Sequence, residues 1–253
     1  MKSTKPTVGF YSITGCAGCL LSFIFNEKEI VQMTKLVTIV SFPFIHESAE
    51  IKEVDVAFME GLVASPEDEE VLKEVRKKAK TLVALGACAH TACIPGYRHF
   101  VPKDSYARLM YEKLHKIKTI EPGPIDKYVQ VDFTIPGCPP NKREIIKSVV
   151  NLCLKKQLKN YTSPVCVECR RNNNRCLLEE NRICLGPITR GGCNAICTNS
   201  HFECWGCRGP TDDMNLPAFI ELLEGKGFTK RDIRERIIAF SGQKNPKVLE
   251  VLP

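Results

Sequence analysis

Fourteen of the 253 residues are cysteines, and the densest group falls between residues 164 and 209. Eight cysteines lie there, with a C-x2-C pair at each end: Cys166, Cys169, Cys176, Cys184, Cys193, Cys197, Cys204 and Cys207. Cysteines at this density indicate either a disulfide scaffold or bound metal. The first residues show no apolar export signal, so we expect a cytoplasmic chain in which thiols stay reduced and ligate metal.

Four more cysteines each follow a predicted strand, in the sequences TGCAGC, LGACAH and IPGCPP: Cys16, Cys19, Cys88 and Cys138. In an open parallel sheet, ligands bind beyond the carboxyl ends of the strands. We therefore expect these thiols to converge at one edge, where neighbouring glycines let the backbone approach a bulky group. Four thiolates suit a cubane iron-sulfur cluster or an all-cysteine zinc site.

The eight clustered cysteines divide into two further sets of four, which leaves Cys93 and Cys153. Cys153 comes four residues after Val149 on the apolar face of a predicted helix, so we interpret it as a core thiol. Cys93 lies in a predicted loop close to Cys88, and we interpret it as non-ligating. The intervals between the clustered cysteines lack strand alternation, which favours a relay of redox centres over zinc ribbons.

The elements that must position these residues alternate along the first part of the chain. Short β-branched runs predict strands at 7–13, 36–42, 54–60, 81–87 and 128–135. Amphipathic stretches predict helices near 18–33, 66–79, 104–115 and 141–158. Ser65 and Pro66 supply an N-cap and a first-turn proline for the second of these helices. This alternation predicts an α/β, flavodoxin-like parallel-sheet domain over residues 1–160.

Residues 161–253 show a different pattern and predict a second, cysteine-rich domain. From about residue 160 to about residue 210 there is almost no apolar periodicity, so bound metal must supply most of the organisation of this segment. Residues 211–253 regain helical character in LPAFIELLEGKGF and TKRDIRERIIAF. Thr229 and Asp232 predict a capping box at the start of the second of these helices.

The charge pattern argues against nucleic-acid binding. The formal net charge is +7, but basic residues are interspersed with acidic ones, as in EDEEVLKEVRKKAK at 67–80. Such mixing is typical of a solvated helix face. No apolar stretch approaches the roughly 20 residues that a membrane-spanning helix requires, so we predict no membrane span.

Seven sequence blocks, taken in order, resemble a known family. They are GFYSITGCAGC, VDVAFMEG, LVALGACA, GCPP, PVCVECR, CLGPITRGGCNAIC and CWGCRG, and they extend from about residue 8 to about residue 210. Together they are similar to the small, electron-transferring subunit of cytosolic nickel-iron hydrogenases, of the sulfhydrogenase delta and methyl-viologen-reducing hydrogenase type. Any one C-x2-C pair alone would be a weak signal.

The resemblance implies three 4Fe-4S clusters and no nickel ligands in this chain. It implies a proximal cluster on Cys16, Cys19, Cys88 and Cys138, facing a nickel-iron centre in a separate large subunit. It implies a distal cluster on Cys166, Cys169, Cys176 and Cys184, and a medial cluster on Cys193, Cys197, Cys204 and Cys207. In periplasmic relatives a histidine begins the distal set and the medial set has only three cysteines; Cys166 and Cys197 stand at those positions here.

The resemblance suggests two electron acceptors, and PVCVECR and the C-terminal helical tail look closer to the first, the sulfhydrogenase type. Sulfhydrogenase-like complexes pass electrons to a flavin subunit that uses NAD(P) and to further iron-sulfur subunits, whereas the methyl-viologen group serves heterodisulfide reductase. The quinone-reducing subunit of complex I resembles only the first half and carries adjacent cysteines, unlike the C-x2-C of Cys16 and Cys19. A structural zinc-binding adaptor and a free ferredoxin-like carrier are the alternatives from other classes. The roles of Glu60, at a strand end, and of His90 stay open.

Overall fold

A computed structural model describes residues 5–45, 50–102, 118–156, 158, 161–245 and 247–252. It separates into two compact units, which we call the sheet unit (Met1–Lys159) and the cysteine-rich unit (Asn160–Pro253). The helix predicted near 104–115 lies outside the described residues.

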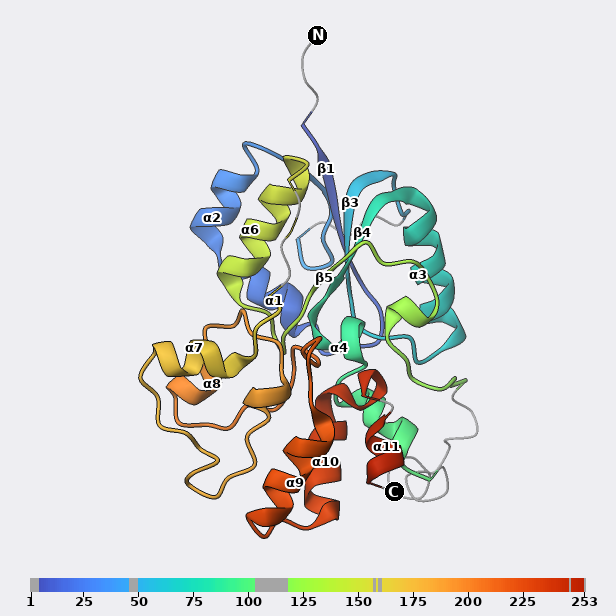
Figure 1. The fold of residues 1–253 in the computed structure, drawn as a ribbon. Coiled ribbons are helices and arrows are strands. Elements are labelled where there is room, and N and C mark those ends of the chain that lie inside the picture. Colours follow the sequence, from blue (N-terminus) through green and yellow to red (C-terminus); the bar gives the residue numbers. More distant parts are fainter. Residues whose placement is uncertain are drawn as a thin grey trace. The chain divides into compact units, whose positions relative to one another are not determined.

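The sheet unit contains five parallel strands in the order β2-β1-β3-β4-β5 (Figure 1). Their bounds are Thr7–Ser12 for β1, Thr38–Ser41 for β2, Val54–Glu60 for β3, Ala79–Leu85 for β4 and Phe133–Ile135 for β5. This order confirms the predicted flavodoxin-like α/β fold, in which the chain reverses its direction of winding between β1 and β3. The strands buried in the middle of the sheet read as nearly continuous apolar runs, as expected for a sheet covered on both faces.

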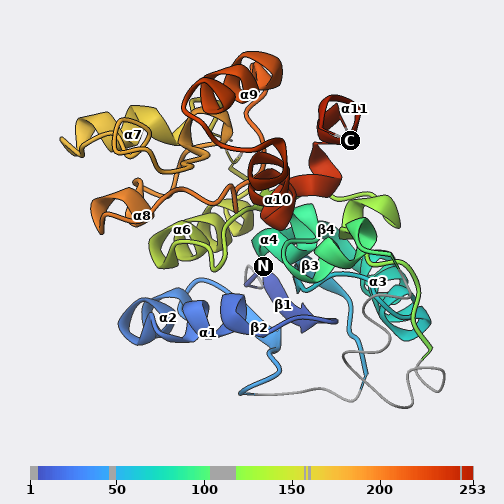
Figure 2. The ribbon, with the colours of Figure 1, turned by 90° about the horizontal axis from the view of Figure 1, so that it is seen from below.

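Helices cover both faces of this sheet (Figure 1, Figure 2). On one face lie α1 (Gly18–Ile24), α2 (Glu27–Met33) and α6 (Lys142–Cys153), and on the other lies α3 (Pro66–Lys78). The first face packs around four stacked or tilted phenylalanine rings, Phe10, Phe23, Phe42 and Phe58. Cys153 belongs to the same apolar cluster, where its side chain packs as a small hydrophobe.

Two helices differ from the sequence-based expectation. The helix predicted near 18–33 is interrupted, because the Asn26 side-chain amide donates to the carbonyls of Ser22 and Phe23 and so caps the end of α1. The strand predicted at 81–87 ends at Leu85, and the chain turns at once into α4 (Gly86–Thr91). Cys88 therefore lies on a short helix. After α4 comes a 3-10 turn at Pro95–Phe100, and another stands at Ile125–Lys127 ahead of β5.

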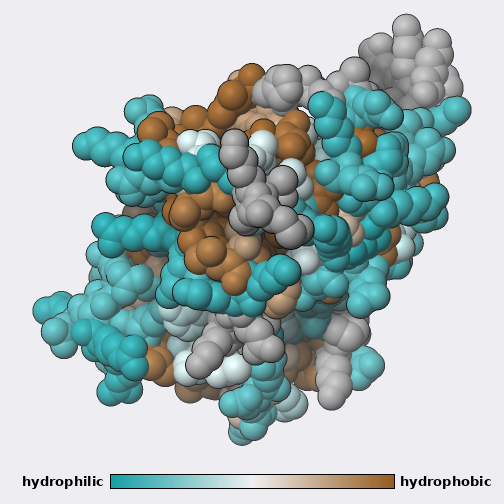
Figure 3. Space-filling view, turned by 90° about the horizontal axis from the view of Figure 1, so that it is seen from above, coloured by the Kyte–Doolittle hydropathy of each residue, from teal (hydrophilic) through white to brown (hydrophobic). Residues whose placement is uncertain are grey.

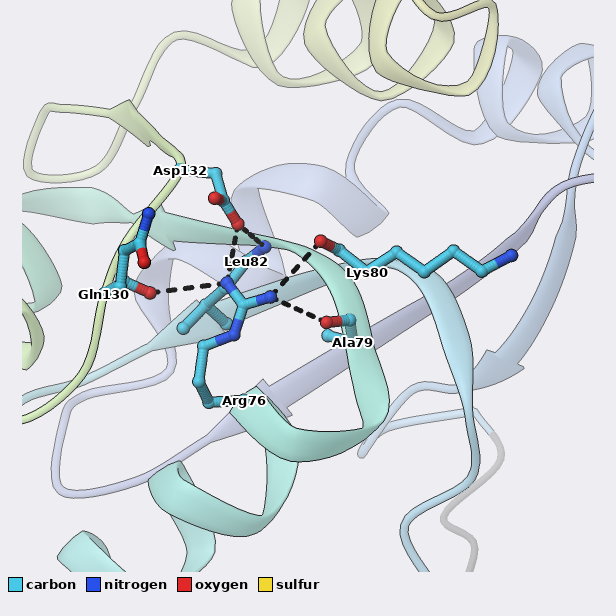
Figure 4. A network of polar contacts seen from close by, with 6 residues as sticks. All are labelled: Arg76, Ala79, Lys80, Leu82, Gln130 and Asp132. Atoms are coloured by element: carbon cyan, nitrogen blue, oxygen red, sulfur yellow. Dashed lines mark hydrogen bonds and ion pairs between the residues drawn. The ribbon is translucent and has the colours of Figure 1, made fainter.

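Both ends of α3 are fixed by specific polar contacts. At its start, the predicted N-cap is confirmed as a full capping box between Ser65 and Asp68. At its end, the Arg76 guanidinium donates to the Asp132 carboxylate at 2.6 Å and to the carbonyls of Ala79 and Lys80 (Figure 4). Because Asp132 also accepts the Leu82 N–H at 2.7 Å, this one cation ties α3, β4 and the segment before β5 together.

The cysteine-rich unit contains short helices and a helical tail. The short elements are α7 (Val165–Arg171), a 3-10 turn at Gly186–Ile188 and α8 (Ile196–Asn199). The tail comprises α9 (Leu216–Gly225), α10 (Lys230–Ser241), a 3-10 turn at Gly242–Lys244 and α11 (Lys247–Val251). The predicted capping box of Thr229 and Asp232 is confirmed at the start of α10.

Amide side chains hold the loops of the cysteine-rich unit together. Asn172 and Asn174 both donate to the Asn199 side-chain oxygen, at 2.9 and 2.7 Å. Asn199 in turn donates to the Asn194 carbonyl at 2.8 Å. These contacts replace the ladder hydrogen bonds that hold strands in the other unit, and they link α7 to α8.

The described residues include no helix that is both long and apolar enough to cross a membrane. Large apolar side chains nevertheless reach the surface of the sheet unit, among them Phe25, Val31 and Ile45, each 64% exposed. In the view from above, brown hydrophobic surface lies between hydrophilic side chains (Figure 3).

Candidate metal centres

The carboxyl ends of four neighbouring strands stand in register in the sheet unit. Glu60, the last residue of β3, pairs with Ser12 of β1 and with Leu85 of β4, and Leu85 pairs with Ile135 of β5. Whatever follows each strand must therefore lie at the same edge of the sheet. The segments that follow β1, β4 and β5 carry Cys19, Cys88 and Cys138.

Glycine is required where these segments meet. A Cβ atom at Gly86, which has φ +90°, would lie 2.2 Å from the Cys19 sulfur. The next residue, Ala87, donates its N–H to the Gly137 carbonyl at 2.7 Å. The start of α4 thus lies against the Cys19 thiol on one side and is hydrogen-bonded to the loop before Cys138 on the other. Position 86 has no room for a side chain.

Three predicted ligand thiols are electrostatic neighbours at this edge. Burial raises the pKa of Cys19, and Glu60, Cys88 and Cys138 raise it further. Cys138 is shifted the other way, because a hydrogen bond from Cys93 lowers its pKa to about 7. A thiol that ionises near neutral pH is already close to the thiolate form that binds metal.

Cys93 is a fifth thiol in this cluster. Its side chain is 3% exposed and its φ of +46° lies in the left-handed region, directly after the end of α4. Hydrogen bonding with Cys138 and Cys88, together with burial, raises the pKa of Cys93, so it stays protonated and its one S–H can donate to either neighbour. The fourth predicted ligand, Cys16, is exposed and lies two residues before Gly18, whose Cβ position is 3.3 Å from the Cys16 sulfur.

Glu60 lies beneath the same cluster. Its side chain is 1% exposed and accepts the backbone N–H groups of Cys19 at 3.2 Å and Leu20 at 3.0 Å. Burial raises the pKa of this carboxyl. Because it accepts these two N–H groups, Glu60 fixes the backbone at Cys19 and Leu20. The sequence alone had left the role of Glu60 open. His90, the other residue left open, stands in the last turn of α4.

The cysteine-rich unit brings together the first four of its eight cysteines. The sulfurs of Cys166 and Cys184 lie 3.1 and 3.6 Å from the Cβ position of Gly186, so a side chain there would meet both. Burial raises the pKa of Cys166 to about 12, and Cys184, Cys169 and Cys176 add to the shift. These four thiols are therefore mutual neighbours around α7 and the Gly186–Ile188 turn.

The other four cysteines adjoin this set at Cys184. Cys197 interacts electrostatically with Cys193 and Cys184, and Cys204 interacts with Cys207 and Cys184. The backbone N–H of Cys204 also donates to the Cys184 sulfur at 3.3 Å. The two predicted sets thus meet at one residue, which belongs to the first set in the sequence-based grouping.

Charged side chains flank Cys193. The Glu168 carboxylate accepts the N–H groups of Gly192 at 2.9 Å and Ala195 at 3.3 Å, and so shapes the loop on both sides of this cysteine. Arg208 is 2% exposed and donates its Nε to the Gly191 carbonyl at 2.6 Å. Burial raises the pKa of Cys193, and the Arg208 charge opposes that rise.

The donor chemistry fits iron-sulfur clusters. Each set offers thiols rather than carboxylate or imidazole ligands, and in the first two sets a glycine lies beside the sulfurs, at Gly18 and Gly86 in one and at Gly186 in the other. Among the residues that the structure describes, no three His, Cys, Asp or Glu side chains have the arrangement to hold a metal ion. The sulfurs around a cubane stand further apart than those around one ion, because the cluster lies between them.

Comparison with known proteins identifies the family. A family model described as NADH ubiquinone oxidoreductase, 20 Kd subunit, matches residues 16–152. The sulfhydrogenase 2 delta subunit of Pyrococcus furiosus is 36% identical over 220 residues, which cover 86% of this chain and 92% of that protein. The chain belongs to this family, among the small subunits of nickel-iron hydrogenases.

Two further relatives support the assignment of this hydrogenase small subunit. One belongs to the vhu F420-non-reducing hydrogenase of Methanocaldococcus jannaschii and is 32% identical over 236 residues, which cover 81% of this chain and 82% of that protein. A chain from the crystal structure of an NAD+-reducing [NiFe]-hydrogenase in the H2-reduced state superposes with a TM-score of 0.56 at 27% identity, covering 61% of this chain and 94% of that chain. The resemblance read from the sequence motifs is confirmed, and the protein is a subunit of an oxidoreductase.

Sequence reasoning missed several residues around the hydrogenase subunit's thiols. Cys93 was predicted to be a non-ligating thiol in a loop close to Cys88, and its further interaction with Cys138 gave no sequence signal. Arg208 gave no signal, because it is an arginine in a segment with several other charged residues.

Proposed function

We propose that this hydrogenase small subunit conducts electrons through three 4Fe-4S clusters. In this proposal the proximal cluster is held in the sheet unit by Cys16, Cys19, Cys88 and Cys138. The cysteine-rich unit holds the distal cluster on Cys166, Cys169, Cys176 and Cys184 and the medial cluster on Cys193, Cys197, Cys204 and Cys207. When bound, such clusters accept and release single electrons.

One observation carries the proposal. Four strand ends in register bring Cys19, Cys88 and Cys138 to one edge, and a buried Glu60 fixes the backbone at the first of them. Hydrophobic packing alone would not require this arrangement, in which three thiols lie close together and position 86 can hold only glycine. The residues themselves position sulfur, supply N–H donors and keep water away from the buried thiols.

Partners follow from the same placement. We propose that a large subunit with the nickel-iron site covers the edge that holds the proximal set, since electrons must enter there. Exposed apolar side chains such as Phe25 and Val31 suit subunit contacts. We further propose a cytoplasmic complex that passes electrons to a flavin subunit using NAD(P). The NAD+-reducing activity in the name of one solved relative favours this acceptor.

The decisive experiment is anaerobic co-expression with a tagged small subunit, followed by metal analysis. We expect about twelve iron atoms and about twelve acid-labile sulfides per chain. We also expect a nickel-containing partner in an interface above the standard size of about 1,600 Å2. Stoichiometric zinc in place of iron would indicate a structural adaptor, and an iron-loaded chain without a nickel partner would indicate a free carrier.

A second measurement identifies the acceptor. With hydrogen as the electron source, the complete complex should reduce NAD+ or NADP+. The resemblance to methyl-viologen-reducing hydrogenases leaves one competing proposal, electron delivery to heterodisulfide reductase. Activity with a heterodisulfide and its reductase, and none with pyridine nucleotides, would replace the flavin proposal while leaving the electron-transfer role in place.

A further inference from the structure

Arg236 lies on α10, outside the cysteine segment, yet it packs directly on it. The centre of its guanidinium lies 3.5 Å from the ring centroid of Trp205, which stands between Cys204 and Cys207. Phe240, one turn further along α10, meets the same ring edge-on at 6.0 Å. This helix therefore fixes the loop that carries the last two cysteines, and stacking on Trp205 fixes the plane of the guanidinium.

One nitrogen of this guanidinium has no acceptor. Arg236 Nη1 is buried and finds no hydrogen-bond partner in the part of the chain that the structure describes. Buried N–H donors in folded proteins almost always have a partner, so an acceptor is expected at this point. The thiols of Cys184 and Cys204 are among the electrostatic neighbours of Arg236, which makes sulfur a natural acceptor.

The nearby acidic side chain, Glu203, does not accept a hydrogen bond from Arg236 Nη1. Glu203 is the strongest anionic neighbour of Arg236, but its carboxylate is engaged by Arg182 Nε at 2.7 Å. Glu203 is thus shared between two arginines. The charge of Arg236 also lies near Cys184 and Cys204, where the two four-cysteine sets adjoin.

We propose that Arg236 tunes the iron-sulfur relay by donating Nη1 to a sulfur of the group held at Cys184 or Cys204. The inference rests on the proposed function, since it requires clusters at these cysteines. Reduction adds negative charge in a partly buried site, where an adjacent cation stabilises the reduced state. Arg236 is accordingly a positioning residue that raises a reduction potential without ligating iron.

The test uses the complete complex, purified anaerobically with Arg236→Gln, and an EPR-monitored redox titration. At the wild-type midpoint potential, the ratio of reduced to oxidised cluster should fall roughly tenfold for one signal, which for a one-electron couple is about 59 mV. Iron content should be unchanged. Arg236→Lys should retain iron and give a smaller shift in the same direction, because it keeps the charge but loses the stacked, planar donor.

Arg231→Gln is the matched control. It removes the same charge from the same helix, but the Arg231 side chain is 84% exposed and pairs with Glu235. All signals should titrate as in the wild type. Unchanged potentials in an iron-loaded Arg236→Gln complex would overturn the inference. If the Arg236→Gln complex loses iron, the Arg236→Lys complex becomes the test. An unchanged reduction potential in Arg236→Lys would then overturn the inference. A wild-type complex without iron would instead sink the proposed function.

Discussion

The two units position their thiols by different means. In the sheet unit, the cysteines follow strands whose ends are set by an apolar core, with side chains such as Phe10, Phe58 and Leu85 fully buried. In the segment from 161 to 210, the cysteines stand on short helices and turns that polar side chains such as Asn199 and Glu168 connect. We therefore expect the first site to be organised before any metal binds, and the second to need a bound metal group that bridges its ligands.

The largest difference between the two units should appear when the metal is removed. After oxidative loss of iron and chelation, we expect amides in 161–210 to lose their protection from hydrogen exchange. Amides of β1, β3 and β4 should keep theirs, because ladder hydrogen bonds and core packing persist without metal. Hydrogen-deuterium exchange with mass spectrometry measures amide exchange in both regions in one sample. Equal loss of protection in both units would show that the sheet unit also needs its cluster to fold.

Removing one thiol at the junction should have the next largest effect. Cys184→Ala should lose about four irons per chain, the content of one cubane. Its sulfur also accepts the Cys204 N–H, so the EPR signal of the adjoining cluster should change as well. Cys153→Ala is the control, because that thiol packs in the apolar core of the sheet unit. Loss of iron in the control would mean that Cys153 is a ligand.

Cys93 provides a sharper test within the sheet unit. Its hydrogen bonds to Cys138 and Cys88 raise its pKa, which keeps it a neutral donor. Cys93→Ala should therefore retain all iron but lower the potential of the proximal signal, because a donor to the ligand sulfurs is lost. Cys93→Ser retains a donor and should stay closer to the wild type. A loss of about four irons in both variants would make Cys93 a ligand.

The same contrast explains what the sequence could predict. In the sheet unit, β-branched runs end at in-register positions, so TGCAGC, LGACAH and IPGCPP marked one edge correctly. The break at Asn26 depends on which carbonyls a side-chain amide reaches, and periodicity carries no such information. The approach of Arg236 to Trp205 joins positions 31 apart across an irregular segment. No local spacing rule predicts a contact of that kind.

The smallest effects should come from the two capping boxes, one in each unit. Ser65→Ala should cost about 1 kcal/mol in the sheet unit. Asp68 will still hold the Thr14 N–H at 3.0 Å and the Thr14 hydroxyl at 2.8 Å, so the loop leading to Cys16 keeps its anchor and iron content should not change. Exchange should quicken only in the first turn of α3.

Thr229→Ala is the matching change in the cysteine-rich unit. Hydrogen bonds from Thr229 hold the pKa of Asp232 below its ordinary value, so the stabilisation is present at neutral pH and is lost as the pH falls through that lowered pKa. The variant should therefore quicken exchange at the start of α10 at neutral pH and weaken this acid dependence, because only the backbone N–H of residue 229 is left to donate to Asp232. If α10 also fixes the Trp205 loop, a weakened first turn should slightly loosen amides near Cys204 and leave those of α3 unchanged. Faster exchange in α3 would show that the two units do not respond independently.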